Sequence, residues 1–239
     1  MATRTGLARI GLALAAGSAV VAAILAKGHA SAFASRLPTL VSMGVAWSAG
    51  ISVALGGALL ALRGDLDQGV VALARTRGVG LPAYARGRIW GLTVLIAFTV
   101  GAAVLGVAFT TILEAPDRLA ATREAAAALT YAFAFAVTMG PLAMAALGTG
   151  GRLIGYLCLL AVIGLPELLA GWTETLLPAG WRELTSIPSA LAAVAAGVRS
   201  GAPAFWHMLR ALAGLAAIVA ASLAAVWARL AQAEAGGPS

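Results

Sequence analysis

The sequence predicts an all-α membrane protein, a single transmembrane domain over residues 1–239 with six membrane-spanning helices. Three observations predict this fold class. Hydrophobic residues make up 61% of the chain, charged residues only 10%, and the mean hydropathy is +0.95, whereas soluble domains carry roughly 25% charged residues. Apolar runs of about 20 residues are long enough to cross a hydrocarbon core about 30 Å thick. The runs are continuous and do not alternate, so helices are expected and not the strands of a barrel.

Six apolar stretches supply the predicted spans. They cover residues 10–26, 39–62, 89–113, 125–147, 153–170 and 209–228. The first stretch is followed by Ala32-Phe33-Ala34, which resembles a signal-peptidase site, so cleavage as a signal peptide is the alternative for this stretch. Its length of about 17 residues exceeds the apolar region of a typical signal peptide, which favours a span.

The positions of the basic residues predict the orientation. With both termini cytoplasmic, nine of the 16 Lys and Arg residues lie on the inner side, which is the side that membrane proteins enrich in these residues. Five of the nine fall in one loop between spans two and three: Arg63, Arg75, Arg77, Arg86 and Arg88. Topology therefore explains the net charge of +7, and no nucleic-acid partner is expected. The dominance of Arg over Lys is typical of a GC-rich bacterial genome, so the expected location is the bacterial inner (plasma) membrane.

The charged loop between spans two and three contains a predicted amphipathic helix. Leu66, Val70 and Leu73 recur at i, i+4 and i+7 and therefore share one helical face, with Arg75 on the other. Gly78 and Gly80 are expected to end this helix. A short amphipathic helix is thus expected on the cytoplasmic side, ahead of span three.

A second segment, residues 171–208, is too broken to cross the membrane. Within it, "SIPSALAAVAAGV" predicts a helix of about twelve residues that Ser186 caps and that has Pro188 in its first turn. Such a helix is too short to span, so it is expected to lie on or dip into the outer leaflet between spans five and six.

Three stretches of this sequence carry a resemblance to a known family. They are "DQGVVALARTRGVGLPAYARGRIWG" from Asp67 to Gly91, "GLPELL" from Gly164 to Leu169, and "SIPSAL" from Ser186 to Leu191. The first is similar to a family pattern of an acidic residue, a Gly, an "LL..R" stretch and then "RGVS...Y...R". Together with the arrangement of spans, these stretches resemble the permease subunit of an ABC-2 type transporter.

The resemblance implies a function and a set of partners. The helix between spans two and three would be the coupling helix, which docks on a separate ABC ATPase subunit, and the outer segment would form short re-entrant helices. The residues expected to couple to the ATPase are Asp65, Asp67, Val70, Leu73, Arg75, Arg77 and Gly78. The permease would act as a homodimer or with a second permease in the lipid bilayer. ATP and Mg would bind to the partner subunit, and this chain would bind no cofactor.

The charges of the coupling segment are expected to lie at the rim of the contact with the ATPase, where charge pairs contribute more to specificity than to affinity. Arg86 and Arg88 are interpreted more simply as cytoplasmic anchors of span three. Glu167 beside Pro166, at the outer end of span five, is a candidate intramembrane functional residue, because carboxylates within a membrane often have a function. The alternative for Glu167 is an interfacial residue near the re-entrant segment.

The motifs that are missing exclude several chemistries. The sequence has no G-x-x-x-x-G-K-[ST] motif, so the chain is not expected to be an enzyme and ATP hydrolysis is assigned to another subunit. It has no H-E-x-x-H motif, and its two histidines are too few for a typical zinc site, so no metal is expected. Two alternatives to the ABC exporter remain: a haem-export permease of the same architecture, and a non-transporting membrane scaffold that uses the basic loop to recruit a partner or anionic lipid.

Overall fold

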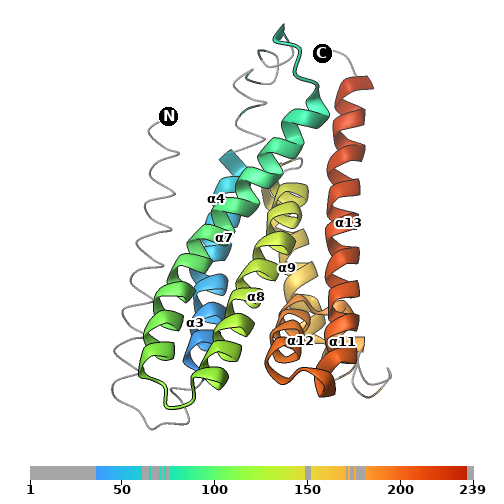
Figure 1. Cartoon of the computed structure of the whole chain (residues 1–239). Helices are drawn as coiled ribbons and strands as arrows, with labels where there is room; N and C mark the ends of the chain where they lie inside the picture. Colours follow the sequence, from blue (N-terminus) through green and yellow to red (C-terminus); the bar gives the residue numbers. More distant parts are fainter. Residues whose placement is uncertain are drawn as a thin grey trace.

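The computed structural model of the chain describes residues 36–60, 65, 70, 73, 76–148, 152–170, 172, 175 and 181–235. These residues form helices joined by short turns, and none of them forms a strand. The all-α prediction is therefore confirmed over the described part of the chain. Figure 1 shows the longer helices standing side by side as a bundle.

The helices follow one another in this order along the chain. They are α3 (Leu37–Val45), the π-helical turn η1 (Ala46–Gly50), α4 (Ile51–Ala58), α7 (Leu81–Glu114), α8 (Arg118–Ala143), the π-helical turn η3 (Met144–Gly148), α9 (Arg152–Leu168), α11 (Trp181–Thr185), α12 (Ile187–Ser200), the 3-10 turn η4 (Ala202–Ala204) and α13 (Phe205–Ala235). Because α3, η1 and α4 are contiguous, they form one long apolar helix.

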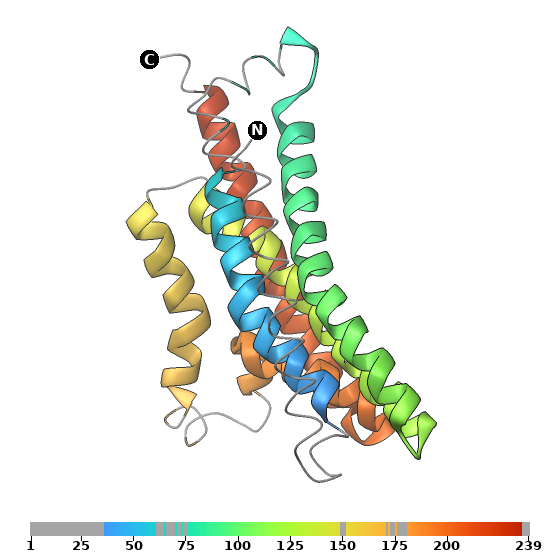
Figure 2. The ribbon, with the colours of Figure 1, turned by 90° about the vertical axis from the view of Figure 1, so that its left-hand side faces the viewer.

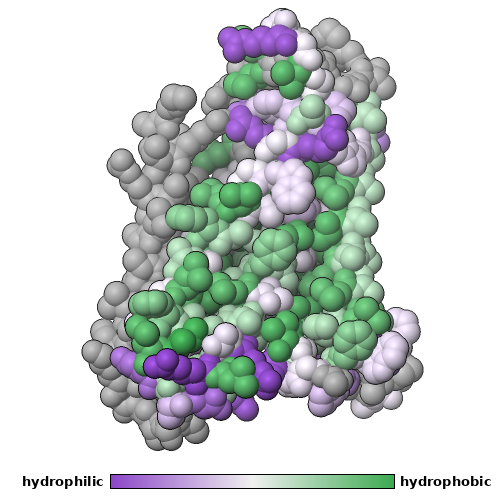
Figure 3. Space-filling view, viewed as in Figure 1, coloured by the Kyte–Doolittle hydropathy of each residue, from purple (hydrophilic) through white to green (hydrophobic). Residues whose placement is uncertain are grey.

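Four helical stretches are long and apolar enough to cross a membrane. They are Leu37–Ala58, Leu81–Glu114, Arg118–Leu147 and Phe205–Gln232. The surface in Figure 3 has a hydrophobic middle with hydrophilic groups gathered at both ends, as expected of a protein surrounded by lipid. This is the composition of a membrane protein with several transmembrane helices.

The other two predicted spans are not among these four stretches. The stretch 10–26 lies outside the described residues. The stretch 153–170 corresponds to α9, which is apolar and has 17 residues, or about 25 Å of helix at 1.5 Å per residue. Figure 2 shows α9 at the edge of the bundle.

The centre of the bundle is α8. In the apolar stretch of the candidate span that contains α8, 72% is buried inside the protein. In the corresponding stretch of α13, 28% is buried. Tyr131 and Phe135 are fully buried in α8, and the indole of Trp47 donates a hydrogen bond of 2.7 Å to the Tyr131 hydroxyl. Ser42 Oγ donates to the carbonyl of Ala128 at 2.8 Å. These bonds join the first long helix to α8 where the side chains have no water to bind.

Small residues let α7 and α8 approach closely. A Cβ atom added at Gly140 would lie 2.2 Å from Thr93 Oγ1 and 3.2 Å from Thr93 Cα, so only glycine fits at this crossing. The next residue, Pro141, lies inside α8, and the π-helical turn Met144–Gly148 follows it. Since proline removes one backbone donor, this change of helical winding directly after it is physically reasonable.

The predicted start of span three at residue 89 is wrong as a helix boundary. The helix begins at Leu81, with Pro82 in its first turn and the preceding Gly80 in extended conformation. Proline is favoured at this place, because its fixed φ suits the first turn and its missing N–H has no helical partner there. Arg86 and Arg88, which were expected in the loop, therefore lie in α7 itself.

Span four also begins earlier than predicted. Asp117 caps α8, and its Oδ1 accepts hydrogen bonds from the backbone N–H groups of Leu119 and Ala120 at 3.0 and 3.1 Å. As a result Arg123 and Glu124 belong to the first two turns of the helix. Hydropathy had placed the start of this span at residue 125, because it detects only the apolar part of a helix. The first two turns of α8 are polar, so hydropathy does not include them.

The expected short helix is present as α12, and its cap is confirmed. Ser186 Oγ accepts a hydrogen bond of 3.2 Å from the N–H of Ser189, and Pro188 lies in the first turn. The 14 residues of Ile187–Ser200 end at Gly201, which has a φ of +67°. Together with α11, this helix lies at the end of the bundle opposite to the start of α7 (Figure 1). We call the end that holds Leu81 the proximal end and the end that holds α11 and α12 the distal end.

Candidate functional site

The charged segment is fastened to the proximal end of α7 by three side chains. Tyr84 and Arg88 are four residues apart and therefore lie on one face of the helix. The Tyr84 hydroxyl donates a hydrogen bond of 2.5 Å to Asp65 Oδ2, and Arg88 forms an ion pair with the same oxygen. The Asp65 side chain is completely buried. We call Asp65, Tyr84 and Arg88 the proximal triad.

The geometry of the proximal triad leaves little freedom to its members. Arg88 Nη2 and Nε donate to the Tyr84 hydroxyl at 2.8 and 3.1 Å, and the guanidinium carbon lies 5.1 Å from the centroid of the Tyr84 ring. Each member thus contacts both others. A carboxylate that is buried together with its counter-charge is strongly tied to it, because losing one partner leaves the other charge uncompensated. The triad can therefore hold the start of the charged segment against α7.

Asp65 was expected as a charge on the rim of a partner contact, and its carboxylate is buried and bonded to Tyr84 and Arg88 of its own chain. A fully buried carboxylate that is already paired within the chain does not offer a charge to another protein. Arg88, which was interpreted as an anchor of span three, also takes part in this internal contact. The sequence places Asp65 and Arg88 in the same region between spans two and three, but nothing in it predicts the contact between them.

The other predicted coupling residues are placed less completely. Asp67 and Arg75 lie outside the described residues. Leu73 is helical with 58% of its surface exposed, Val70 is helical and half-buried, and Arg77 is exposed. Gly78 has a φ of +76°, a conformation that glycine adopts without strain, which agrees with the prediction that it ends a helix. Leu73 therefore offers an apolar side chain to the outside at the same end of the molecule.

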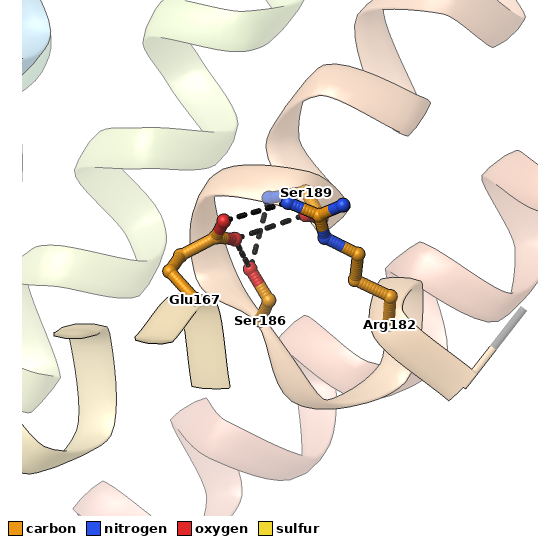
Figure 4. A network of polar contacts seen from close by, with 4 residues as sticks. All are labelled: Glu167, Arg182, Ser186 and Ser189. Carbon is orange, nitrogen blue, oxygen red and sulfur yellow. Dashed lines mark hydrogen bonds and ion pairs between the residues drawn. The ribbon is translucent and has the colours of Figure 1, made fainter. Parts of the chain in front are cut away.

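A second polar network occupies the distal end and includes Glu167. Arg182 Nη2 donates to Glu167 Oε2 at 2.8 Å, and Ser189 Oγ donates to Glu167 Oε1 at 3.0 Å. The hydroxyl of Ser186, which caps α12, also donates to Glu167 Oε1. Figure 4 shows three side chains, those of Arg182, Ser186 and Ser189, converging on the carboxylate of Glu167 from α11 and the start of α12. We call these residues the Glu167 network.

The Glu167 network brings together two stretches that the sequence analysis had singled out separately. Glu167 belongs to "GLPELL" and Ser186 and Ser189 belong to "SIPSAL". The carboxylate is a connector between the end of α9 and the short distal helices, and with 31% of its side chain exposed it lies near a surface. Its position corresponds to the alternative of a residue beside the segment that was expected to be re-entrant.

A third network was missed from the sequence. Arg199, near the end of α12, donates to both carboxylate oxygens of Glu124 at 2.5 and 3.1 Å and to Thr39 Oγ1 at 3.1 Å. Glu124 is buried, with 6% of its side chain exposed. The two-pronged geometry is the strong form of an arginine–carboxylate pair. One guanidinium thereby joins α12, α8 and α3, and we call this contact the Arg199 clamp.

A signal for the Arg199 clamp existed in the sequence, but it was incomplete. Glu124 stands directly before an apolar run, where an unpaired carboxylate would be costly. Arg199 was counted only as a basic residue of an outer segment, on the same side as Glu124. Residues 75 positions apart pair because two helices happen to meet, and no periodicity in either helix reveals that meeting.

Metal binding finds no support in the part of the chain that the structure describes. No three His, Cys, Asp or Glu side chains of that part are grouped so that they could hold an ion. The shortest acid–histidine contact there is the 2.5 Å distance from His207 Nδ1 to Glu183 Oε1, which joins α13 to α11 at the distal end.

Comparisons with protein-family models, with curated proteins and with solved structures returned no match to this chain.

Proposed function

We propose that this chain is the permease subunit of an ABC exporter, which forms the substrate pathway and couples to a separate ATPase subunit. The observation that carries the proposal is the proximal triad. A transporter driven by ATP must pass force from a soluble motor to its membrane helices. A segment fastened to α7 through Asp65, Tyr84 and Arg88 would pass a displacement directly to that helix.

Two further features support the proposal. The start of α7, which Asp65 contacts through Tyr84, and the short helices α11 and α12 lie at opposite ends of the bundle (Figure 1). The resemblance to ABC-2 permeases implies such opposite ends for a coupling helix and for outer re-entrant helices. Exposed Leu73 and Arg77 lie at the proximal end, where an apolar anchor with a neighbouring charge suits a docking contact.

The proposal includes six spans, of which residues 10–26 and α9 would be the first and the fifth. Both termini would be cytoplasmic in a bacterial inner membrane, so the proximal end would face the cytoplasm. The pathway would lie between two protomers of a homodimer or between this chain and a second permease. ATP and Mg would be bound by the partner ATPase, and this chain would supply no cofactor.

The coupling contact is tested by reversing its exposed side chains. In the variant Leu73→Asp with Arg75→Glu and Arg77→Glu, co-purification with the partner ABC ATPase should fall at least about tenfold, the size expected when an interface anchor is lost. The exposed distal arginines Arg118 and Arg123, both changed to Glu, provide the matched control and should leave binding unchanged. The measurement is the amount of bound ATPase and its stimulated hydrolysis in membranes that contain equal amounts of each variant.

Normal binding in the triple variant would reduce the segment to a topology signal and remove the main reason for proposing a transporter. Genes of cytochrome maturation beside this chain would instead favour the haem-export permease. The absence of any neighbouring ATPase gene would favour the membrane scaffold.

The orientation is tested with a matched pair of threonines. Thr76 and Thr175 are both exposed, and each hydroxyl donates to the carbonyl three residues earlier at 2.8 Å. In a Cys158→Ala background, a membrane-impermeant thiol reagent added to intact cells should label Thr175→Cys and not Thr76→Cys. Both should be labelled after the membrane is permeabilised. The reverse pattern in intact cells would invert the proposed topology.

A further inference from the structure

A groove lies between α7 and α13, with α8 as its floor, and it is separate from the polar networks described above. Its volume is about 220 Å³. Enclosed sites for whole drug-sized ligands measure roughly 300–1,000 Å³, so this groove is too small for such a molecule. An elongated chain that lies partly outside the protein fits it better.

The two walls of the groove are regular helical stripes. Arg86, Trp90 and Thr93 follow at i, i+4 and i+7 on α7, and Leu223 and Trp227 follow at i and i+4 on α13. From Arg86 to Thr93 the α7 wall is about 10 Å long. The groove therefore runs along the helix axes, from the proximal end into the apolar part of the bundle.

The polarity of the groove changes along this axis. Arg86 is exposed at the proximal end, and the part that leads away from it is lined by aliphatic side chains and by Pro141 of α8. Because α7 and α13 run in opposite directions, Trp227 of α13 lies toward the same end as Arg86 and Trp90. Tryptophan prefers the level of lipid headgroups, where its ring is apolar and its N–H can bind a polar partner.

The charge at the polar end is positive and available. Among the residues that the structure describes, no acidic side chain lines the groove and no carboxylate pairs with Arg86. An arginine is suited to phosphate, which it can bind with two parallel hydrogen bonds. A positive end followed by two indoles and an apolar channel matches a molecule with an anionic head and a hydrocarbon tail.

We propose that this groove binds one anionic phospholipid from the leaflet at the proximal end. Its phosphate contacts Arg86, its glycerol region lies between Trp90 and Trp227, and one acyl chain follows the groove over α8 toward Val219. The lipid is a bound component of the membrane-embedded chain and is not its cargo. The inference therefore stands or falls separately from transport.

The test uses the two indoles as reporters of the lipid that touches them. The full chain, with Trp172, Trp181 and Trp206 changed to Phe, is placed in phosphatidylcholine vesicles. These vesicles contain rising fractions of phospholipid with bromine on its acyl chains, which quenches tryptophan fluorescence. Trp47 is kept in every arm because it binds Tyr131 in the core. With brominated phosphatidylglycerol, half of the maximal quenching of tryptophan fluorescence should be reached at a mole fraction about fivefold lower than with brominated phosphatidylcholine. This is the preference expected from one arginine at a membrane surface.

Two single substitutions decide whether the preference belongs to the groove. Arg86→Gln should abolish the fivefold difference, and Arg86→Lys should keep most of it because the charge remains. Arg77→Gln is the matched control, since it removes one exposed arginine at the same end but outside the groove, and it should keep the full difference. Equal helical content by circular dichroism should accompany all three.

Each other outcome would overturn the proposal. A preference that survives Arg86→Gln, or that Arg77→Gln also removes, would come from the general positive charge of the chain. Loss of the preference in an excess of inorganic phosphate would identify the occupant as the free anion. Weak quenching by both lipids would mean that protein, such as a second copy of this chain, covers the groove.

Discussion

The two ends of the bundle are held together in different ways. At the distal end, three polar networks cross between helices: the Arg199 clamp joins α12, α8 and α3, the Glu167 network joins α9 to α11 and α12, and the pair of His207 with Glu183 joins α13 to α11. At the proximal end, the proximal triad joins Asp65 to α7.

This difference indicates which end can move more easily. Helices that are joined by polar networks at one end resist separation there, most of all where the Arg199 clamp would leave the buried Glu124 carboxylate without its partner. At the other end, α7 can shift together with the segment fastened to it without breaking a described polar contact to another helix. The helices that the distal networks join are thus expected to separate less easily at that end, and the following predictions test that contrast.

The largest effect is expected from the Arg199 clamp. Arg199→Ala leaves the buried Glu124 carboxylate without its counter-charge and should lower the free energy of unfolding by about 3 kcal/mol, the lower end of the range for buried pairs. The lower end applies because 33% of the Arg199 side chain is exposed. The measurement is denaturant unfolding of the purified chain in detergent micelles, followed by helical content.

Arg123 offers a control for this prediction, since it is exposed and precedes Glu124 directly. Arg123→Ala should change the free energy of unfolding by no more than about 0.5 kcal/mol. Adding Glu124→Gln to Arg199→Ala should recover part of the loss, because it removes the uncompensated charge. Equal stabilities for Arg199→Ala and Arg123→Ala would show that the distal end is not held by this contact.

A smaller and more local effect is expected at the proximal triad. Asp65→Ala removes the oxygens that Tyr84 and Arg88 bind, and it should destabilise the local contact by about 2 kcal/mol, as for hydrogen bonds to charged groups. Arg88 is 27% exposed and can be hydrated in part when it loses Asp65. Amide hydrogen exchange should become about 30-fold faster in residues 81–88, by the usual conversion of free energy to a ratio, and should not change in α12.

The exposed Arg86, two positions from Arg88 on the same helix, supplies the control, and Arg86→Ala should leave exchange in residues 81–88 nearly unchanged. If Asp65→Ala instead accelerates exchange throughout the bundle, the proximal triad stabilises the whole fold and the contrast between the two ends disappears.

The smallest effect is expected at the cap of α12. Ser186→Ala removes the oxygen that accepts the Ser189 N–H and the hydroxyl that donates to Glu167, and it should lower the free energy of unfolding by about 1 kcal/mol. Ser200→Ala at the exposed far end of the same helix should have no measurable effect. A loss for Ser186→Ala as large as that for Arg199→Ala would make the Glu167 network, and not the Arg199 clamp, the main connection at the distal end.

Local signals were sufficient where an element depends on its own residues. The start of α12 was predicted from Ser186 and the following Pro188, because a capping hydroxyl and a first-turn proline act within one turn of backbone. The start of α7 was placed too late, although Pro82 after Gly80 carried the same kind of signal. Hydropathy had dominated the interpretation there, and a helix that continues beyond the bilayer is polar at its end.

For the candidate sites, the sequence identified individual charged residues, and the structure identified their partners. The sequence analysis singled out Glu167 because carboxylates within a membrane often have a function, and it placed Asp65 among the coupling residues that the resemblance implies. It did not identify their partners. Asp65 was expected to face another protein, and the structure buries it against Tyr84 and Arg88 within the same chain.

By itself the sequence determined that this chain is helical, that it is apolar enough for a membrane, and where its short distal helix begins. These properties follow from composition and from interactions within a few residues. Only the tertiary structure decided that Arg199 meets Glu124, that "GLPELL" meets "SIPSAL", and that Arg86 stands at the polar end of an apolar groove. Such contacts depend on how the helices cross, and a crossing is fixed by the fit of whole helix faces, as where Gly140 admits Thr93.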